Sequence, residues 1–186
     1  MRIITGKARG LKLRTPAGFS TRPTADRIKE SLFNILGGLI NFSDVDVVLD
    51  IFAGTGALGL ESISRGARSA IFVDAATTEI IRENLTRAKF DGCKILRGDF
   101  RKILPRLNRQ GATFGLIFSD PPYATDFAQI SLDSVAELNL LVEGGLIAVE
   151  HAAEKILQPP KNFQLVRQTI YGHTTAITIL ERKSTP

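Results

Sequence analysis

Cysteine and histidine are scarce in this chain of 186 residues, which contains one cysteine and two histidines. A single cysteine, Cys93, excludes an intrachain disulfide and a cysteine-rich zinc site, and we expect it to be a buried structural thiol. With only His151 and His173 present, a histidine-based metal site is also not expected. The sequence therefore favours chemistry without a metal.

Long apolar runs are also missing. No stretch is long enough to span a bilayer, and the N-terminus lacks the apolar segment and cleavage site of a signal peptide. We therefore expect a cytoplasmic protein without a membrane partner. At 44% hydrophobic residues the chain can bury a substantial core, so we expect residues 1–186 to form one domain, and we expect a monomer.

Positive charge is concentrated at the N-terminus. The formal net charge is +5, yet the first 30 residues carry +6 and the remainder carries −1. Basic and apolar residues alternate around Gly6 and Gly10, a pattern typical of a hairpin, and we define residues 1–22 as the basic segment. We expect it to bind RNA phosphates, the alternative being a merely solvated tail. Its candidate contact residues are Arg2, Lys7, Arg9, Lys12, Arg14 and Arg22.

The remaining pattern predicts an α/β fold. A helix is expected within 23–40, with Thr24 as its N-cap and Gly37-Gly38 at its end. In the catalytic core at 41–186, strand-like and helical runs alternate, which indicates βαβ units and a mostly parallel sheet. The expected strands are 45–50, 69–74, 93–97, 114–119 and 145–151, with helices at 57–65, 76–90, 100–109 and 126–139 and a C-terminal antiparallel hairpin formed by 163–171 and 174–182. This order of elements resembles the seven-stranded, Rossmann-like arrangement of class I methyltransferases.

A glycine turn follows the first expected strand. Gly54, Gly56 and Gly59 satisfy G-x-G-x-x-G, and Asp74 ends the next apolar run at the distance expected of a ribose-binding acid. Alone this would indicate a nicotinamide dinucleotide. However, a carboxylate at Asp50, just before the turn, would repel a pyrophosphate and attract a cofactor that carries sulfonium and ammonium groups. The sequence therefore favours S-adenosylmethionine.

The tetrapeptide Asp120-Pro121-Pro122-Tyr123 follows the apolar run 114–118. A carboxylate and proline carbonyls can accept the hydrogen bonds of an exocyclic amine, and a tyrosine ring can stack on a planar base. We predict that these four residues hold a nucleobase amine for methyl transfer. The alternative is a proline-rich turn with a packing tyrosine.

With these residues in view, the chain resembles the bacterial 16S rRNA guanine-N2 methyltransferases that act on guanine 966 of the small ribosomal subunit. The resemblance runs nearly end to end and is most specific in the segments 21–24 and 32–36, Thr-Arg-Pro-Thr and Leu-Phe-Asn-Ile-Leu. It implies that the cofactor lies against the glycine turn, with Asp74 at its ribose and Asp99 and Phe100 beside its adenine. The implied cofactor-binding residues are Thr24, Asp50, Phe52, Ala53, Gly54, Thr55, Gly56, Asp74, Asp99 and Phe100.

The expected function is thus methylation of a guanine N2 amine in 16S rRNA, either free or in an assembling small subunit. Other readings stay open at this point: a DNA amino-methyltransferase acting on adenine N6 or cytosine N4, a nicotinamide oxidoreductase, and a non-catalytic RNA-binding assembly factor. Asp99 can equally cap the next helix, and Asp74 can be an ordinary turn residue. The basic residues within 101–109 form either an RNA-facing or a solvated surface.

Overall fold

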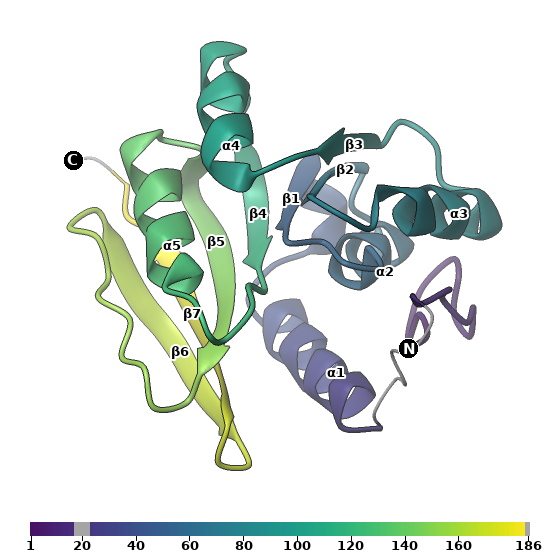
Figure 1. The fold of residues 1–186 in the computed structure, drawn as a ribbon, viewed down its shortest axis with the longest axis horizontal. Coiled ribbons are helices and arrows are strands. Elements are labelled where there is room, and N and C mark those ends of the chain that lie inside the picture. The colour runs from purple at the N-terminus through teal and green to yellow at the C-terminus, as the bar shows by residue number, and fades with distance from the viewer. Residues whose placement is uncertain (17–22, 185–186) are drawn as a thin grey trace.

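A seven-stranded sheet runs through the molecule, with helices on both faces (Figure 1). The computed structural model describes residues 1–16 and 23–184, without the side chains of 23–25. The strand order is β3-β2-β1-β4-β5-β7-β6. Strands β1 to β5 pair in parallel, whereas β7 runs antiparallel to both β5 and β6. This is the fold that the sequence predicts, including the C-terminal hairpin.

The helices and strands have the following bounds, in chain order. They are α1 Pro23–Gly37, the 3-10 helix η1 Phe42–Asp44, β1 Val47–Ile51, α2 Ala57–Arg65, β2 Ser69–Asp74, α3 Thr78–Ala88, β3 Lys94–Arg97, α4 Phe100–Arg109, β4 Phe114–Ser119, α5 Phe127–Glu137, β5 Leu141–Ala152, β6 Phe163–Tyr171 and β7 Thr175–Arg182. None of the helices in the described ranges is long and apolar enough to cross a membrane.

The apolar core has two layers, one on each face of the sheet. Helices α1, α2 and α3 pack on one face, and α4 and α5 pack on the other. Neighbouring strand residues alternate between the layers, since Val48 belongs to the first and Leu49 to the second. A parallel sheet that is covered on both sides explains the continuous apolar runs of its central strands.

Several predicted boundaries differ from the structure by one to four residues, and two of the differences have a clear physical reason. Thr24 was expected to cap α1, but the helix begins at Pro23, so Thr24 lies in its first turn. Proline is well suited to a first helical position because its missing N–H would have no partner there. Strand β5 begins at Leu141, earlier than the expected 145, because an irregularity in its pairing with β4 lets the strand continue through Gly144, whose φ is 71°.

The described part of the basic segment forms a short hairpin-like turn. Arg2 and Lys12 make an antiparallel bridge, and the Ile3 N–H donates to the Leu11 carbonyl at 2.9 Å. Ile3 and Leu13 are buried in the core layer formed with α1 and α2. The segment is therefore docked on the folded core, and a freely solvated tail does not describe it.

Candidate functional site

A cleft of about 1100 Å³ opens at the carboxyl ends of β1, β2, β4 and β5. Strand order reverses between β1 and β4, and open α/β sheets bind ligands at such a switch point. The lining residues include ten predicted site residues: Phe52, Gly54, Thr55, Asp74, Asp99, Phe100, Asp120, Pro121, Pro122 and Tyr123. The sequence thus identified much of this wall.

Asp50 is buried beneath the glycine turn and does not line the cleft. Its Oδ2 accepts a hydrogen bond of 2.9 Å from the backbone N–H of Gly59, at the start of α2. A Cβ at Gly59 would lie 2.4 Å from the Phe72 ring, so only glycine lets the helix approach this closely. Burial raises the pKa of Asp50 to about 7. Ala53 and Gly56 are also buried outside the cleft wall.

Asp74 ties the ends of two neighbouring strands together. Its Oδ2 accepts from the Gly54 N–H at 2.9 Å, and its Oδ1 accepts from the N–H groups of Ala76 and Thr77 at 2.8 Å each. These hydrogen bonds outweigh partial burial and lower the pKa of Asp74. A carboxylate has roughly four acceptor positions, so about one remains for a ligand hydroxyl. The turn role and a ribose-binding role are therefore compatible at Asp74.

Three phenylalanine rings form an apolar wall of the cleft. The Phe52 and Phe100 ring centroids are 4.8 Å apart, and the Phe52 ring stacks on Phe127 at 6.0 Å with an interplanar angle of 10°. Phe52 adopts a left-handed backbone conformation with φ of 61°, which is unusual for a bulky residue and places its ring here. Such a wall can receive the flat face of a purine.

Asp99 caps α4 at the edge of this wall. Its Oδ1 accepts from the Arg101 N–H at 2.9 Å, which confirms the capping interpretation, and it forms an ion pair with the Arg101 guanidinium. The Arg101 side chain, through its hydrogen bond, holds the pKa of Asp99 below its ordinary value. Because the carboxylate also lines the cleft, capping does not remove it from contact with a ligand.

Asp120 and Glu150 bring two carboxylates to one side of the cleft. They follow Ser119 and Val149, which are paired across β4 and β5, and both side chains line the cleft. Asp120 is exposed to the cleft, yet the surrounding protein limits the hydration of its carboxyl group. This desolvation, together with the charges of Glu150 and Asp50, raises the pKa of Asp120 well above its ordinary value. Burial likewise raises the pKa of Glu150. Both groups therefore hold a proton more readily than free carboxylates do.

The Tyr123 phenol connects this pair to the C-terminal hairpin. Its O–H donates to Glu150 Oε1, and its oxygen lies 2.8 Å from Thr175 Oγ1 in β7. Poor hydration, followed by the Glu150 hydrogen bond, raises the pKa of Tyr123, so the phenol stays protonated. The residue is 37% exposed, which leaves part of its side chain available for stacking.

Among the cleft residues that sequence reasoning missed, Glu150 and Phe127 matter most for the chemistry of the site. Glu150 lies near the carboxyl end of β5, as Asp74 and Asp120 end or follow their strands, so the same rule could have found it. Phe127 begins α5 and carried no comparable signal.

The basic segment is anchored to α2 through Glu61, whose side chain is fully buried. Glu61 accepts from the N–H groups of Ile4 and Thr5 at 2.7 and 3.0 Å and pairs with Lys29 and Arg65 at 3.1 and 2.9 Å. A buried carboxylate is stable only with such partners. One side chain therefore joins the basic segment, α1 and α2.

Asn84 of α3 makes a second anchor, close to the glycine turn. Its Oδ1 accepts from the Arg14 N–H at 2.7 Å, while its Nδ2 donates to the carbonyls of Arg14 and Thr55 at 3.1 and 2.9 Å. Thr15 and Pro16, which follow, line the cleft. The basic segment therefore runs from its exposed Lys and Arg side chains to the wall of the cleft.

The predicted RNA-contact side chains in the described range project from this anchored backbone. Arg2, Lys7, Arg9, Lys12 and Arg14 are all exposed. Arg14 forms a surface ion pair of 3.1 Å with Glu83, which is worth little in water and is easily exchanged. Arg22 and the Thr24 side chain, also predicted site groups, lie outside the described residues.

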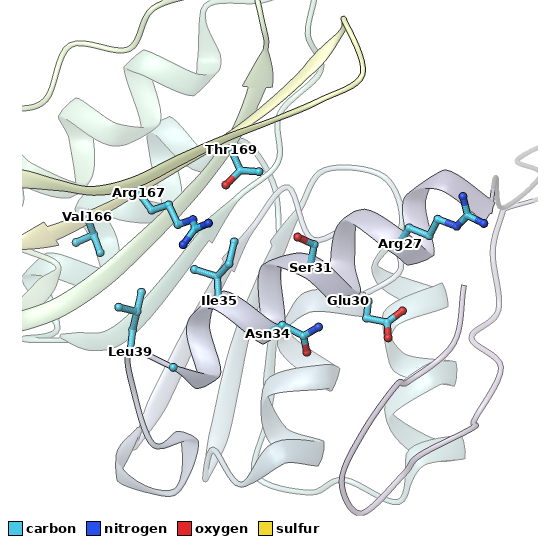
Figure 2. Close-up of a pocket in the computed structure, with 10 residues that line it drawn as sticks. Arg27, Glu30, Ser31, Asn34, Ile35, Leu39, Val166, Arg167 and Thr169 are labelled. Carbon is cyan, nitrogen blue, oxygen red and sulfur yellow. The ribbon is translucent and has the colours of Figure 1, made fainter.

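A second hollow, of about 780 Å³, lies between α1 and β6 (Figure 2). Arg27 stands on its helical wall and Arg167 on its strand wall, with Glu30 and Asn34 beside them. It contains neither the glycine turn nor the carboxylate pair, so the chemistry belongs to the larger cleft. Across residues 1–16 and 23–184, no cluster of three or more His, Cys, Asp or Glu side chains is placed to hold a metal ion.

Comparison with known proteins decides the family. The model of the family described as "Conserved hypothetical protein 95" matches residues 1–180. The chain belongs to this family. Its fold is the class I methyltransferase fold of its structural neighbours.

Individual relatives match over nearly their whole length. The chain is 34% identical to "Putative rRNA methyltransferase YlbH" of Bacillus subtilis over 98% of this chain and 100% of that one. It is also 34% identical to "Ribosomal RNA small subunit methyltransferase D" of Escherichia coli, over 92% and 85% of the two chains. The solved structure named "Putative methyltransferase yhhF from Escherichia coli" superposes with a TM-score of 0.84 at 31% identity, covering 100% and 99%.

Proposed function

We propose that this protein transfers a methyl group from S-adenosylmethionine to the exocyclic N2 amine of a guanine in 16S rRNA, at guanine 966. The relatives named as small-subunit rRNA methyltransferases support the reaction and the RNA. The observation that carries the chemistry is the cleft in which Asp120-Pro121-Pro122-Tyr123 faces the glycine turn. The base and position follow from the resemblance in the Arg-Pro-Thr and Leu-Phe-Asn segments.

The charges of the cleft fit this cofactor better than a dinucleotide. Four carboxylates line it, from Asp74, Asp99, Asp120 and Glu150. Among the described residues of the wall, Arg101 is the one arginine, and it is already paired with Asp99. A pyrophosphate would meet mostly negative charge, whereas a sulfonium and an ammonium group would be attracted. The phenylalanine wall suits adenine, and the remaining acceptor position of Asp74 suits a ribose hydroxyl.

The chain's own residues would prepare the nucleophile. S-adenosylmethionine, when bound, supplies an electrophilic methyl carbon. The Asp120 carboxylate and the Pro121 carbonyl would accept the two N–H bonds of the amine, which frees its lone pair and fixes its direction. Because Asp120 has a raised pKa, it is suited to take the proton that the methylated amine releases. Tyr123 would stack on the base once it has left the RNA stack.

The basic segment would supply affinity and register through phosphate contacts. Its five exposed cations in the described range support this role, as does its path from the surface to the cleft at Thr15 and Pro16. The protein would then act as a monomer on RNA in the cytoplasm, needing no metal.

The test is methylation of small ribosomal subunits, and separately of free 16S rRNA, both from a strain that lacks the enzyme. Radiolabelled S-adenosylmethionine should label one of these substrates once, and mass spectrometry of nuclease fragments should find N2-methylguanine at 966. Label on adenine, on cytosine or on DNA would contradict the proposal. Absence of label on any RNA would favour a non-catalytic assembly factor, with the Asp120→Ala variant as the background control.

A further inference from the structure

We infer that Glu150 selects guanine by accepting the N1–H of the base whose N2 amine faces Asp120. This inference rests on the proposed function and adds the residue that discriminates between bases. Glu150 and Asp120 follow paired residues of adjacent parallel strands, so their carboxylates reach the same side of the cleft. Neighbouring strands lie about 4.8 Å apart, so two side chains from adjacent strands are close enough to converge on neighbouring donors of one base edge.

The hydrogen-bonding pattern of the bases explains why the carboxylates of Asp120 and Glu150 would select guanine. Guanine presents an N–H at N1 directly beside its exocyclic amine. Adenine presents an unprotonated N1 beside N6, and cytosine an unprotonated N3 beside N4. Two neighbouring acceptors therefore match guanine alone among these three, because the other two would set a ring lone pair against a carboxylate.

Glu150 is free to make this contact in the described structure. Its Oε1 accepts from the Tyr123 phenol, while its second oxygen accepts no hydrogen bond from any residue of 1–16 or 23–184. The Tyr123 bond fixes the direction of the carboxylate, and the phenol is itself held by Thr175. Glu150 is half-buried at the cleft wall, and a bound base would cover it further. An oriented acceptor that a ligand covers without supplying a donor is costly, which is what makes such a site selective.

The test uses an RNA in which the target guanine is replaced by 2-aminopurine. This base keeps the 2-amine but has a lone pair at N1 in place of the N–H. The ratio of kcat/KM for guanine over 2-aminopurine is measured for the wild-type protein and for variants. 2-Aminopurine also lacks the O6 of guanine, but this difference is the same in the assays of the wild-type protein and of each variant. The change in the ratio on substitution therefore isolates the effect of Glu150.

Glu150→Gln should lower this ratio at least about tenfold, because its amide can donate to the N1 lone pair. Glu150→Ala should also lower it, through slower reaction of guanine. Tyr123→Phe keeps the ring and the Glu150 acceptor but removes the bond that orients it, so it should lower the ratio less than Glu150→Gln does. Thermal melting checks that each variant is folded.

Three outcomes would overturn the inference. An unchanged ratio in both Glu150 variants would show that Glu150 does not read N1. An equal loss of preference in Tyr123→Phe would reduce Glu150 to a support for the tyrosine. A wild-type protein that methylates a base other than guanine would overturn the proposed function as well. An unexpected result in the variants alone would overturn only the role of Glu150.

Discussion

Asp50 and Gly59 are joined by a 2.9 Å hydrogen bond that connects the end of β1 to the first turn of α2 from below the glycine turn. The carboxylate is only 1% exposed, and its pKa is raised to about 7. The unfolded chain releases this proton near pH 4. The contribution of Asp50 to stability is therefore fully present below about pH 4 and is lost as the pH rises to about 7.

Replacing Asp50 by Asn should remove this pH dependence, because the amide oxygen can still accept from Gly59 but carries no charge. The variant should gain stability relative to wild type between pH 4 and 7, by up to about 4 kcal/mol. Urea unfolding at several pH values in this window measures it. Asp46→Asn, at an exposed site, is the matched control. If the difference in unfolding free energy between Asp50→Asn and wild type does not change with pH, the assignment is contradicted.

Cofactor binding should depend more on Asp74 than on Asp50. Asp74 lines the cleft and holds the Gly54 N–H, whereas Asp50 reaches no cleft surface. Calorimetry with S-adenosylmethionine should show a Kd raised at least about tenfold by Asp74→Ala, consistent with a lost charge-assisted hydrogen bond. Asp50→Asn should weaken binding less. Equal affinities in all three proteins would remove both residues from the cofactor site.

Asp120→Ala should slow methyl transfer by roughly a hundredfold or more, because an aligned acceptor of the amine is lost. Affinity for S-adenosylmethionine should stay within a few fold. Since the pKa of Asp120 is raised, wild-type activity should fall on the acid side at a higher pH than for an ordinary carboxylate. Single-turnover rates across pH measure both effects, and near-normal turnover by the variant would exclude Asp120 from the mechanism.

Replacing Lys7, Arg9, Lys12 and Arg14 together by alanine should weaken RNA binding and flatten its salt dependence. Each lost phosphate contact removes roughly 0.7 to 0.9 from the log-log slope, so four contacts change it by about three. A control that removes four exposed lysines elsewhere, at positions 89, 94, 161 and 183, should change the slope less. If both variants behave alike, the RNA surface must be sought elsewhere, first on the exposed Lys102, Arg106 and Arg109 of α4.

Gly6→Ala should release the basic segment from α2. A Cβ at Gly6 would lie 1.7 Å from the Ser64 carbonyl oxygen, so the segment cannot dock without moving. Gly10→Ala is the matched control, since its φ of 84° resembles the 86° of Gly6 but nothing lies within 4 Å of its Cβ. Hydrogen exchange at Ile4, Thr5 and Lys7 should accelerate in the first variant and much less in the second. Equal protection in both would show that this contact does not hold the segment.

The fold could be predicted well because each helix and strand is indicated by the apolar pattern of its own residues. Helices α2 and α4 have the expected bounds, and Asp74 and Asp120 could be placed in the cleft because they end or follow strands that meet at one edge of the sheet. Asp50 was expected to end its strand, but β1 continues to Ile51. Asp50 lies two residues after Val48 and shares its face, so its side chain points under α2.

The rest of the site depends on which elements become neighbours. Glu150 matters because β5 lies beside β4, and Phe127 because α5 starts where its ring can stack on Phe52. The strand-end rule could have placed Glu150 at the cleft, but its position beside Asp120 and that of the Phe127 ring depend on the packing of elements that are distant in the chain. The anchors at Glu61 and Asn84 join positions more than 50 residues apart in the chain and likewise required the structure.

Asn84 gives the two proposed substrates a common support, because one amide holds both the Arg14 backbone and the Thr55 carbonyl of the glycine turn. A ligand that restrains one of these groups restrains the other through a single rigid side chain. Thermodynamic reciprocity then requires that the factor by which the cofactor strengthens RNA binding equals the factor by which RNA strengthens cofactor binding. Asn84 in α3, which lies outside the cleft wall, would thus couple the binding of the methyl donor to the binding of its acceptor.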